Sequence, residues 1–334
     1  MRSTHRLPAA IVAALLAAPA MAQDAKPVEL KLQSTAPPGT PWGKGVETMM
    51  KIVDTESKGT LALKPGAYGS EQDTVLQLAR GRIDMGTFGL NGAALLVPEL
   101  SLLQLPFYFA SNEEQDCVLD NSMTPVVAEL LARKGVRFTG WNDAGAVHLM
   151  GKKPFVVPAD LQSMKAGTFG TRTYAVFWPA MGASPRPLAT TDVGSAFQTG
   201  LIDVAGNVTT VYVAAGIGKV APVMTRVHLT PGPLLGMINQ ETWDRLTPLQ
   251  REALDKARPV AAQARQTVRG FEAVLVERHR QAGGQFVDIT PQQRAQWRAA
   301  SAPLWPQIVK ELGPDGEKFF ARMEAGRLAC QKGS

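Results

Sequence analysis

Two kinds of hydrophobic spacing alternate along most of this chain, and this alternation limits the folds that it can adopt. Val28, Leu30 and Leu32 alternate with polar residues, which is the two-residue period of a half-buried strand. Apolar side chains between 42 and 53 recur at intervals of three and four, which predicts an amphipathic helix. The same spacing predicts further strands at 60–63, 83–88, 136–141, 147–150 and 166–169. Between them it predicts helices at 70–79, 113–133, 173–181 and 191–199. Strands that alternate with helices predict an α/β architecture with largely parallel sheets.

A helix much longer than one small domain is expected near the end of the chain. Between 247 and 281 only Pro259 and Gly270 interrupt a run of residues with helical spacing. A helix rises by about 1.5 Å per residue, so this one can brace two domains. The length of 334 residues also corresponds to about two domains. A strand is expected at 285–289, followed by helices at 291–312 and 316–328.

The first 22 residues have the three parts of a secretory signal peptide. Arg2 and Arg6 form a basic start, 7–18 is apolar but too short for a membrane span, and 20–22 gives an A-x-A cleavage pattern. We therefore expect residues 1–22 to be removed on export to the periplasm of a Gram-negative bacterium. Loss of the two arginines lowers the formal net charge from +6 to +4, and no run of like charges indicates nucleic-acid binding.

Two cysteines, Cys117 and Cys330, remain in a compartment that permits disulfides. Their separation excludes CxxC redox and zinc motifs. We predict a disulfide that ties the C-terminal tail to a helix near Cys117. Two buried free thiols are the alternative.

Motifs of known catalytic and cofactor sites are missing from the sequence. His148, His228 and His279 lack metal-binding spacings, and there is no G-x-S-x-G elbow or Walker loop. Residues 216–221 match G-x-G-x-x-A, but Pro222 follows where a helix is needed, so we interpret them as a turn. The sequence therefore predicts no enzymatic activity, no metal and no cofactor.

Five short segments carry a resemblance to a known family. They are 69–71 with 81–85, 97–100 with 105–109 (LPFYF), 140–141 with 148–149, 154 with 158–161, and 197–203 (FQTGLID) with Asn207. In this order they resemble the periplasmic solute-binding proteins of TRAP (tripartite ATP-independent periplasmic) transporters, in the subfamily named for four-carbon dicarboxylate uptake. The resemblance covers nearly all of the mature chain.

The resemblance implies a type II-like periplasmic binding protein fold, with two α/β lobes joined by hinge strands and a long bridging helix. Lobe I would comprise 23–144 and 233–272, and lobe II 145–232 and 273–334. It also implies a soluble monomer that captures a small organic acid between the lobes and delivers it to membrane permease subunits. The alternatives are presentation of the ligand to a sensor kinase and a periplasmic hydrolase with the same lobes.

The chain departs from the family at two positions that usually carry arginine. Here they are Val147 and Gly167, so a bidentate carboxylate clamp is missing. Arg172, at the expected start of a helix, is the candidate to replace it, and an arginine that faces solvent is the alternative. Asn207 matches the family position that hydrogen-bonds the ligand, whereas Asp203 is expected to support the fold.

Aromatic side chains near the expected cleft complete the predicted site. Phe169 and Trp141 are the best candidates for stacking on a ligand, because each ends an expected strand. The missing side chain at Gly167 favours a bulky or aromatic monocarboxylate over a compact diacid. An uncharged or zwitterionic solute is the alternative. The predicted ligand-binding residues are Trp42, Phe88, Asn91, Trp141, His148, Gly167, Phe169, Arg172, Asn207 and Tyr212.

Overall fold

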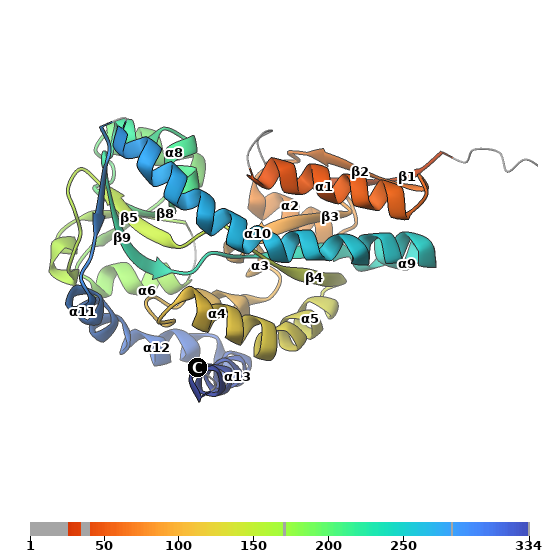
Figure 1. The fold of residues 1–334 in the computed structure, drawn as a ribbon. Helices are drawn as coiled ribbons and strands as arrows, with labels where there is room; N and C mark the ends of the chain where they lie inside the picture. The colour runs from red at the N-terminus through yellow and green to blue at the C-terminus, as the bar shows by residue number, and fades with distance from the viewer. Residues whose placement is uncertain (1–25, 35–40, 170–171, 282, 333–334) are drawn as a thin grey trace, which may run out of the picture.

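The structure, a computed structural model, describes residues 26–34, 41–169, 172–281 and 283–332, and the expected signal peptide at 1–22 lies outside them. Figure 1 shows two lobes that the long helix α10 spans. The strands are β1 (Val28–Gln33), β2 (Leu61–Gly66), β3 (Met85–Gly89), β4 (Val136–Asp143), β5 (Val147–Gly151), β6 (Lys165–Thr168), β7 (Ser184–Pro187), β8 (Val204–Val208), β9 (Val223–Thr230), β10 (Pro233–Asn239) and β11 (Gln285–Asp288). The helices are α1 (Pro41–Glu56), α2 (Glu71–Ala79), α3 (Leu90–Ala93), α4 (Asn112–Val118), α5 (Thr124–Ala132), α6 (Arg172–Ala180), α7 (Val193–Gln198), α8 (Thr209–Ala214), α9 (Gln240–Arg245), α10 (Pro248–Gln281), α11 (Pro291–Ser301), α12 (Leu304–Glu311) and α13 (Gly313–Lys332).

The first lobe is built on a five-stranded sheet in the order β2-β1-β3-β10-β4. β1 is parallel to β2 and β3, whereas β10 is antiparallel to β3 and β4. Ser70 caps α2 by accepting a hydrogen bond from the Asp73 N–H, which fixes where the chain turns after β2. The loops that follow β1, β2 and β3 therefore leave the sheet at one edge, where the carboxyl ends of parallel strands meet.

The second lobe is built on a six-stranded sheet in the order β11-β9-β5-β8-β6-β7. β6 is parallel to β7 and β8, and β11 is parallel to β9. β5 is antiparallel to β8, so Val147 at its start lies beside Val208 at the end of β8. The start of β5 and the ends of β6 and β8 therefore share one sheet edge.

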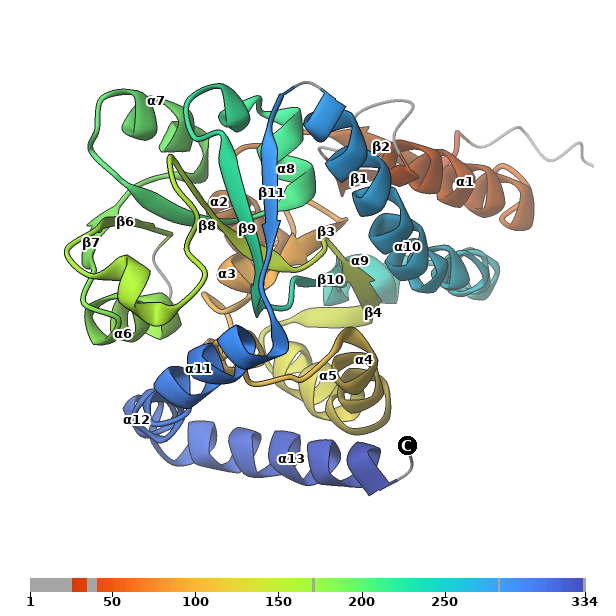
Figure 2. The same cartoon turned by 60° about the vertical axis from the view of Figure 1, so that its left-hand side comes forward.

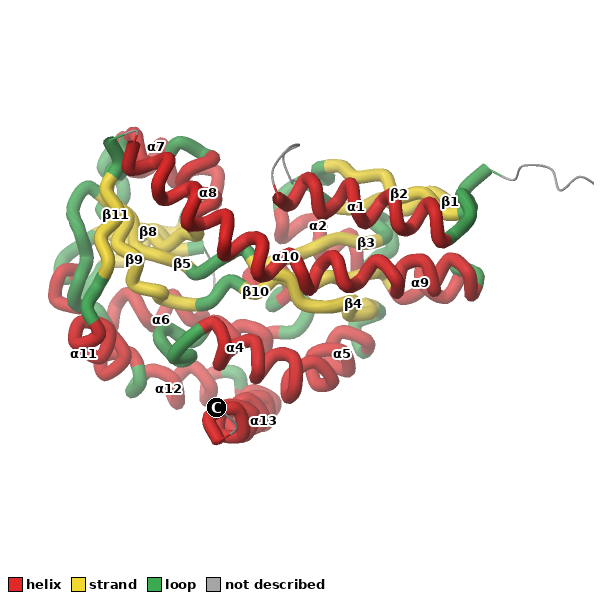
Figure 3. The backbone as a smooth tube through the Cα atoms, in the orientation of Figure 1, coloured by secondary structure: helices red, strands yellow, loops and turns green. Residues whose placement is uncertain are grey.

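The chain crosses between the sheets in two adjacent strands. β4 continues through 144–146 into β5, β9 continues through 231–232 into β10, and the Ala144 N–H donates to the Gly232 carbonyl at 2.9 Å. The sequence pattern predicts largely parallel sheets, but both sheets contain parallel and antiparallel pairs. The antiparallel pairs all involve the crossing strands. α10 makes a further connection, packing on α1 and β4 in the first lobe and on α8 in the second (Figure 3).

The C-terminal helices return from the second lobe to the first (Figure 2). α13 packs on α4 and places Phe319 and Met323 in the buried cluster of the first lobe. Cys330 of α13 is bonded to Cys117 of α4, so the predicted disulfide is present and the alternative of two free thiols is wrong. The strands of each sheet fall within the ranges expected for its lobe, but α13 shares a core with the first lobe. The lobe boundaries therefore stay a prediction.

Of two expected long helices, one is continuous with a π-helical turn inside it, and the other is divided by a proline. The helix expected at 113–133 consists of α4, a π-helical turn (Leu119–Met123) and α5, with Pro125 in the first turn of α5. The helix expected at 291–312 divides at Pro303 into α11 and α12. The segment 216–221 forms a short turn, as predicted. Within the described ranges, every helix is too short or too polar to cross a bilayer.

Candidate ligand-binding site

Three polar side chains at the ends of strands have a buried atom without a hydrogen-bond partner. Asn207 is the second-to-last residue of β8, Thr168 ends β6, and Asn91 follows β3 in α3. Asn207 Nδ2, Thr168 Oγ1 and Asn91 Oδ1 are buried and have no partner in the described part of the chain. Three further atoms of this kind lie in helices away from these strand ends: Gln104 Oε1, Trp178 Nε1 and Ser301 Oγ. Because buried polar atoms are normally hydrogen-bonded, the strand-end atoms are suited to receive a ligand.

The Asn207 amide has a defined orientation. Its Oδ1 accepts a hydrogen bond from the Val208 N–H at 2.9 Å, and the residue is only 8% exposed. Asn207 pairs with His148 across β8 and β5, so it lies at the edge shared by the start of β5 and the end of β8. Its Nδ2 is therefore the group that can donate to a solute.

Glu71, which the sequence analysis did not select, adds a carboxylate to the corresponding edge of the first lobe. It begins α2 directly after the cap Ser70, and the Gly92 N–H donates to its Oε1 at 3.0 Å. Hydrogen bonds from Gly92 and Gly89 stabilise the charged carboxylate, and the residue as a whole is exposed. A signal for it exists in the sequence, because an acidic residue that follows a helix cap at the end of a parallel strand lies where α/β proteins bind ligands.

His148 is fully buried and already has partners. Its Nε2 lies 3.2 Å from Glu272 Oε1, and the His228 N–H donates to its Nδ1. Thr209 Oγ1 donates to the same Glu272 oxygen at 2.7 Å. Burial alone would raise the pKa of the Glu272 carboxyl, but hydrogen bonds from His148 and Thr209 lower it to about 2. The cluster ties α10 to β5 and α8, and direct ligand binding by His148 stays a prediction.

Arg172 matches the alternative of an arginine that faces solvent, and Gly167 lacks the open space that was expected around it. Arg172 Nη1 lies 3.9 Å from a carboxylate oxygen of Glu311 in α12, and its side chain is 61% exposed. This arginine therefore extends toward the C-terminal helices. A Cβ at Gly167 would lie 3.2 Å from Ile202 and from Leu188. Neighbouring side chains thus fill the space that the missing side chain was expected to leave open.

Most of the predicted aromatic residues lie in the hydrophobic cores. Phe88 and Trp141 belong to the core of the first lobe and Tyr212 to that of the second. The Trp141 N–H and the Tyr212 O–H both have protein acceptors. Phe169, after β6, and Trp42, in α1, are only partly buried. These are the two rings of the set that the structure leaves accessible to a ligand.

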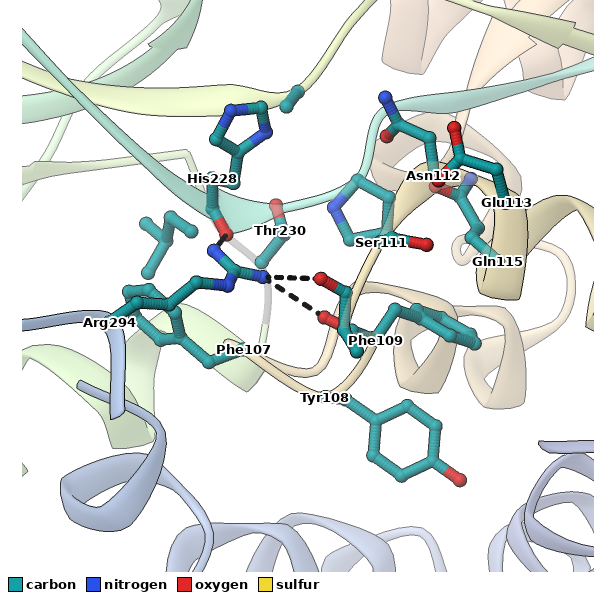
Figure 4. A pocket seen from close by; sticks show the side chains of 14 residues that line it. Phe107, Tyr108, Phe109, Ser111, Asn112, Glu113, Gln115, His228, Thr230 and Arg294 are labelled. Atoms are coloured by element: carbon teal, nitrogen blue, oxygen red, sulfur yellow. Dashed lines mark hydrogen bonds between the residues drawn. The ribbon is translucent and has the colours of Figure 1, made fainter. Parts of the chain in front are cut away.

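A cavity of ≈ 260 Å³ lies at the hinge rather than at the strand ends (Figure 4). It is lined by 107–113 and Gln115 of the first lobe, by Ala146 and 228–231 of the crossing strands, and by Arg294 of α11. The residues predicted for the ligand site are not among its lining residues. This hinge pocket is therefore distinct from the strand-end groups.

Two α/β lobes joined by crossing strands and a long helix, with polar groups at the strand ends, define a bilobed binding protein. The chain belongs to the family of bacterial extracellular solute-binding proteins, family 7 (DctP), whose model matches residues 32–312. It is similar to a solute-binding protein of Chromohalobacter salexigens, with 25% identity over 283 residues that cover 82% of this chain and 83% of that protein. It is also similar to the 2,3-diketo-L-gulonate-binding periplasmic protein of Escherichia coli K12, with 26% identity over 245 residues that cover 71% and 74% of the two chains.

A solved structure shows the same fold. A TRAP periplasmic solute-binding protein from Roseobacter denitrificans, with bound β-D-glucuronate, matches with a TM-score of 0.82 and 25% identity, over 89% of this chain and 99% of that one. The family and these relatives confirm the prediction of a TRAP-type solute-binding protein of the periplasm, rather than an enzyme. They also confirm its expected partners, a small solute and membrane permease subunits.

Proposed function

We propose that this protein captures a hydroxylated monocarboxylate, a sugar acid, in a cleft between its lobes and presents it to a TRAP permease. The observation that carries the proposal is the set of buried, unpartnered atoms at the strand ends, Asn91 Oδ1, Thr168 Oγ1 and Asn207 Nδ2. Asn91 belongs to the first lobe and the other two belong to the second. A solute that bonds to all three makes more contacts in the closed form and therefore favours closure.

The polarity of these groups fits a solute with several hydroxyls. Asn91 Oδ1 and the Glu71 carboxylate accept hydrogen bonds, Asn207 Nδ2 donates, and Thr168 Oγ1 can do either. Sugar hydroxyls donate and accept, and a carboxylate accepts. The two relatives with named ligands support this class, since one binds β-D-glucuronate and the other is named for 2,3-diketo-L-gulonate.

The charge of Glu71 favours a monoacid over a diacid. Its carboxylate lies at the strand-end edge, where it would repel a second anionic group on the solute. Val147 and Gly167 supply no guanidinium to offset that repulsion. A compact four-carbon diacid is therefore disfavoured.

The closing energy required is modest. Micromolar affinity corresponds to about 8 kcal/mol. A hinge that is biased open by a few kcal/mol can be closed by a solute of that affinity, provided that most of its contacts exist only in the closed form.

An aromatic monocarboxylate has less support than the sequence analysis suggested. That hypothesis needs open space at Gly167 and several rings near the solute. Ile202 and Leu188 fill the space, and only Phe169 and Trp42 of the predicted rings are accessible.

An uncharged or zwitterionic solute is the second candidate. The ion pair between Arg172 and Glu311 favours this candidate. Arg172 was the predicted partner of an anionic ligand, and this ion pair directs it toward α12 instead. Amide and hydroxyl groups alone can hold an uncharged sugar.

Calorimetric titration of the mature protein with D-glucuronate, D-glucose, succinate and phenylacetate separates these candidates. Glucose has the hydroxyl-rich ring of glucuronate and lacks its carboxylate. We expect glucuronate to bind with micromolar affinity, at least tenfold more tightly than the other three. Tighter binding of glucose would establish the second candidate, tighter binding of phenylacetate the aromatic one, and tighter binding of succinate would contradict the argument from Glu71.

Two variants test the site itself. Asn207→Ala should weaken glucuronate binding by about 10- to 100-fold, because a hydrogen bond to a buried amide contributes about 1–3 kcal/mol. Arg172→Ala is the control and should leave the affinity within about twofold, because its guanidinium pairs with Glu311. Equal affinity in wild type and Asn207→Ala would refute the placement of the solute at the strand ends.

A further inference from the structure

The hinge pocket joins the two lobes through side chains of different chemistry. Figure 4 shows Asn112, Glu113 and Gln115 on one side of it and His228 and Arg294 on the other. The crossing strands contribute 228–231 and Ala146 to its wall, so its shape depends on the angle between the lobes. A molecule bound there would contact both lobes and would favour one hinge angle.

Arg294 brings to this pocket a positive charge that no carboxylate contacts directly within the described part of the chain. Its guanidinium donates to four backbone carbonyls: Val227 at 2.9 Å, Phe109 at 3.1 Å, and His228 and Ala110 at 3.4 Å. Within the described ranges no acidic side chain forms an ion pair with it. Burial and the nearby charge of Arg298 lower the pKa of Arg294, which shows that the local environment disfavours the cation. An anion in the pocket would offset that cost.

Gln115 provides a polar side chain on the opposite wall. The residue is 2% exposed and lines the pocket. Asn112, one turn earlier in α4, adds a second amide to the lining. An amide N–H donates to a carboxylate oxygen, so these side chains complement an anion from the side that faces Arg294.

Glu113 limits how much negative charge the pocket accepts. It lines the pocket, and a hydrogen bond from Ser111 lowers the pKa of its carboxyl, so it is anionic at neutral pH. The pocket therefore contains one arginine, one carboxylate and neutral amides, together with the imidazole of His228. This balance suits a single negative charge better than a double one.

We propose that the hinge pocket is a second binding site, for a small monocarboxylate whose anionic group lies between Arg294 and Gln115. Because the pocket spans both lobes, its occupant and the solute at the strand ends affect one another's affinity through the hinge angle. This coupling rests on the proposed function, whereas the binding site itself does not.

Acetate is the probe for the test, which uses the mature chain without any sugar acid. ¹H–¹⁵N NMR spectra are recorded while sodium acetate replaces sodium chloride at constant ionic strength. We expect a saturable shift of the Gln115 side-chain amide and of the Asn112 backbone amide, with millimolar affinity. Sodium sulfate should bind at least tenfold more weakly, because it carries two charges. A shift that stays linear with concentration, or tighter binding of sulfate, would overturn the proposal.

Variants assign the shift to the pocket. Gln115→Met should weaken acetate binding at least fivefold, as followed at Asn112, and Arg294→Gln should do the same if it folds. Gln104→Met is the matched control, since Gln104 is also buried but does not line the pocket. It should bind acetate as the wild type does. Unchanged binding in Gln115→Met would refute the site.

Asn207→Ala separates this proposal from the proposed function. Acetate binding that persists in this variant belongs to the hinge pocket, whether or not the variant binds glucuronate. Acetate binding that disappears would show that acetate occupies the strand-end site, and the second site would then be refuted. Absence of glucuronate binding in the wild type would refute the proposed function and leave the acetate titration valid.

Discussion

Removal of the disulfide between Cys117 and Cys330 should destabilise the protein by about 2–5 kcal/mol. The two residues are 213 positions apart, so the bridge closes a very long loop in the unfolded chain. The chain-entropy relation assigns about 5 kcal/mol to a loop of this length, and native disulfides typically contribute about 2–4 kcal/mol. The lower end of the range applies if α13 stays packed on α4 without the bond, because Phe319 and Met323 still bury their side chains there.

The test is equilibrium unfolding in urea of the wild type and of the double variant Cys117→Ala, Cys330→Ala, each with and without a reducing agent. Reduction should lower the unfolding free energy of the wild type to that of the variant, and the variant should not respond to reduction. The thermal midpoint should fall by roughly 5–10 °C. A loss below about 1 kcal/mol would refute the view that the bridge restrains the unfolded chain.

Three further substitutions test other parts of the structure. Glu272 has a folded-state pKa of about 2, below its ordinary value, so the stability that it contributes is present above pH 5 and is lost as the pH falls toward 2. The difference in unfolding free energy between wild type and Glu272→Gln should therefore shrink by about 2 kcal/mol from pH 7 to pH 3 in urea titrations, and an equal difference at both pH values would contradict the pairing with His148. Gly270→Ala should raise stability by about 0.5–1 kcal/mol in thermal unfolding followed by circular dichroism, because the added Cβ meets open space on a helix, and a decrease would show that α10 needs the glycine to bend. Phe319→Ala should cost about 3–5 kcal/mol in urea unfolding, since the ring is 3% exposed, and a loss under 1 kcal/mol would mean that α13 is not part of the first-lobe core.

The periodic and capped elements of the fold could be predicted from the sequence. The long helix expected at 247–281 is α10 (Pro248–Gln281), and Ser70 caps α2 where its type and position indicate. The sequence pattern assigned no strand to β7, β8, β9 or β10. Every residue of β8 (Val204–Val208) is buried, so no alternation marks it, and such a run cannot be recognised by its period. β9 and β10 are fixed by pairings with strands far away in the chain, which no local pattern shows.

The position of a site residue could be predicted when its own strand or helix determines it. The direction of a side chain could not be predicted when contacts with distant parts of the chain determine it. Asn207, which the resemblance selected for ligand binding, lies at the end of β8, and its contact with a ligand stays a prediction. The direction of Arg172 depends on Glu311, which lies in a helix that no local pattern connects to it. An aromatic residue such as Trp141 fits a cleft or a core equally well by its chemistry, and the large area that it buries favours the core.

Because the C-terminal helices return to the first lobe, that lobe cannot complete its fold until the end of the chain is available. A chain that crosses the inner membrane from its N-terminus delivers β1–β3 to the periplasm long before Phe319 and Cys330, which complete the core of that lobe. Arg298, also late in the chain, holds the carbonyls of Phe107 and Tyr108. Contacts between such distant residues form slowly. The first lobe therefore stays immature until translocation is almost over, and an interrupted export event leaves a product that periplasmic proteases can degrade.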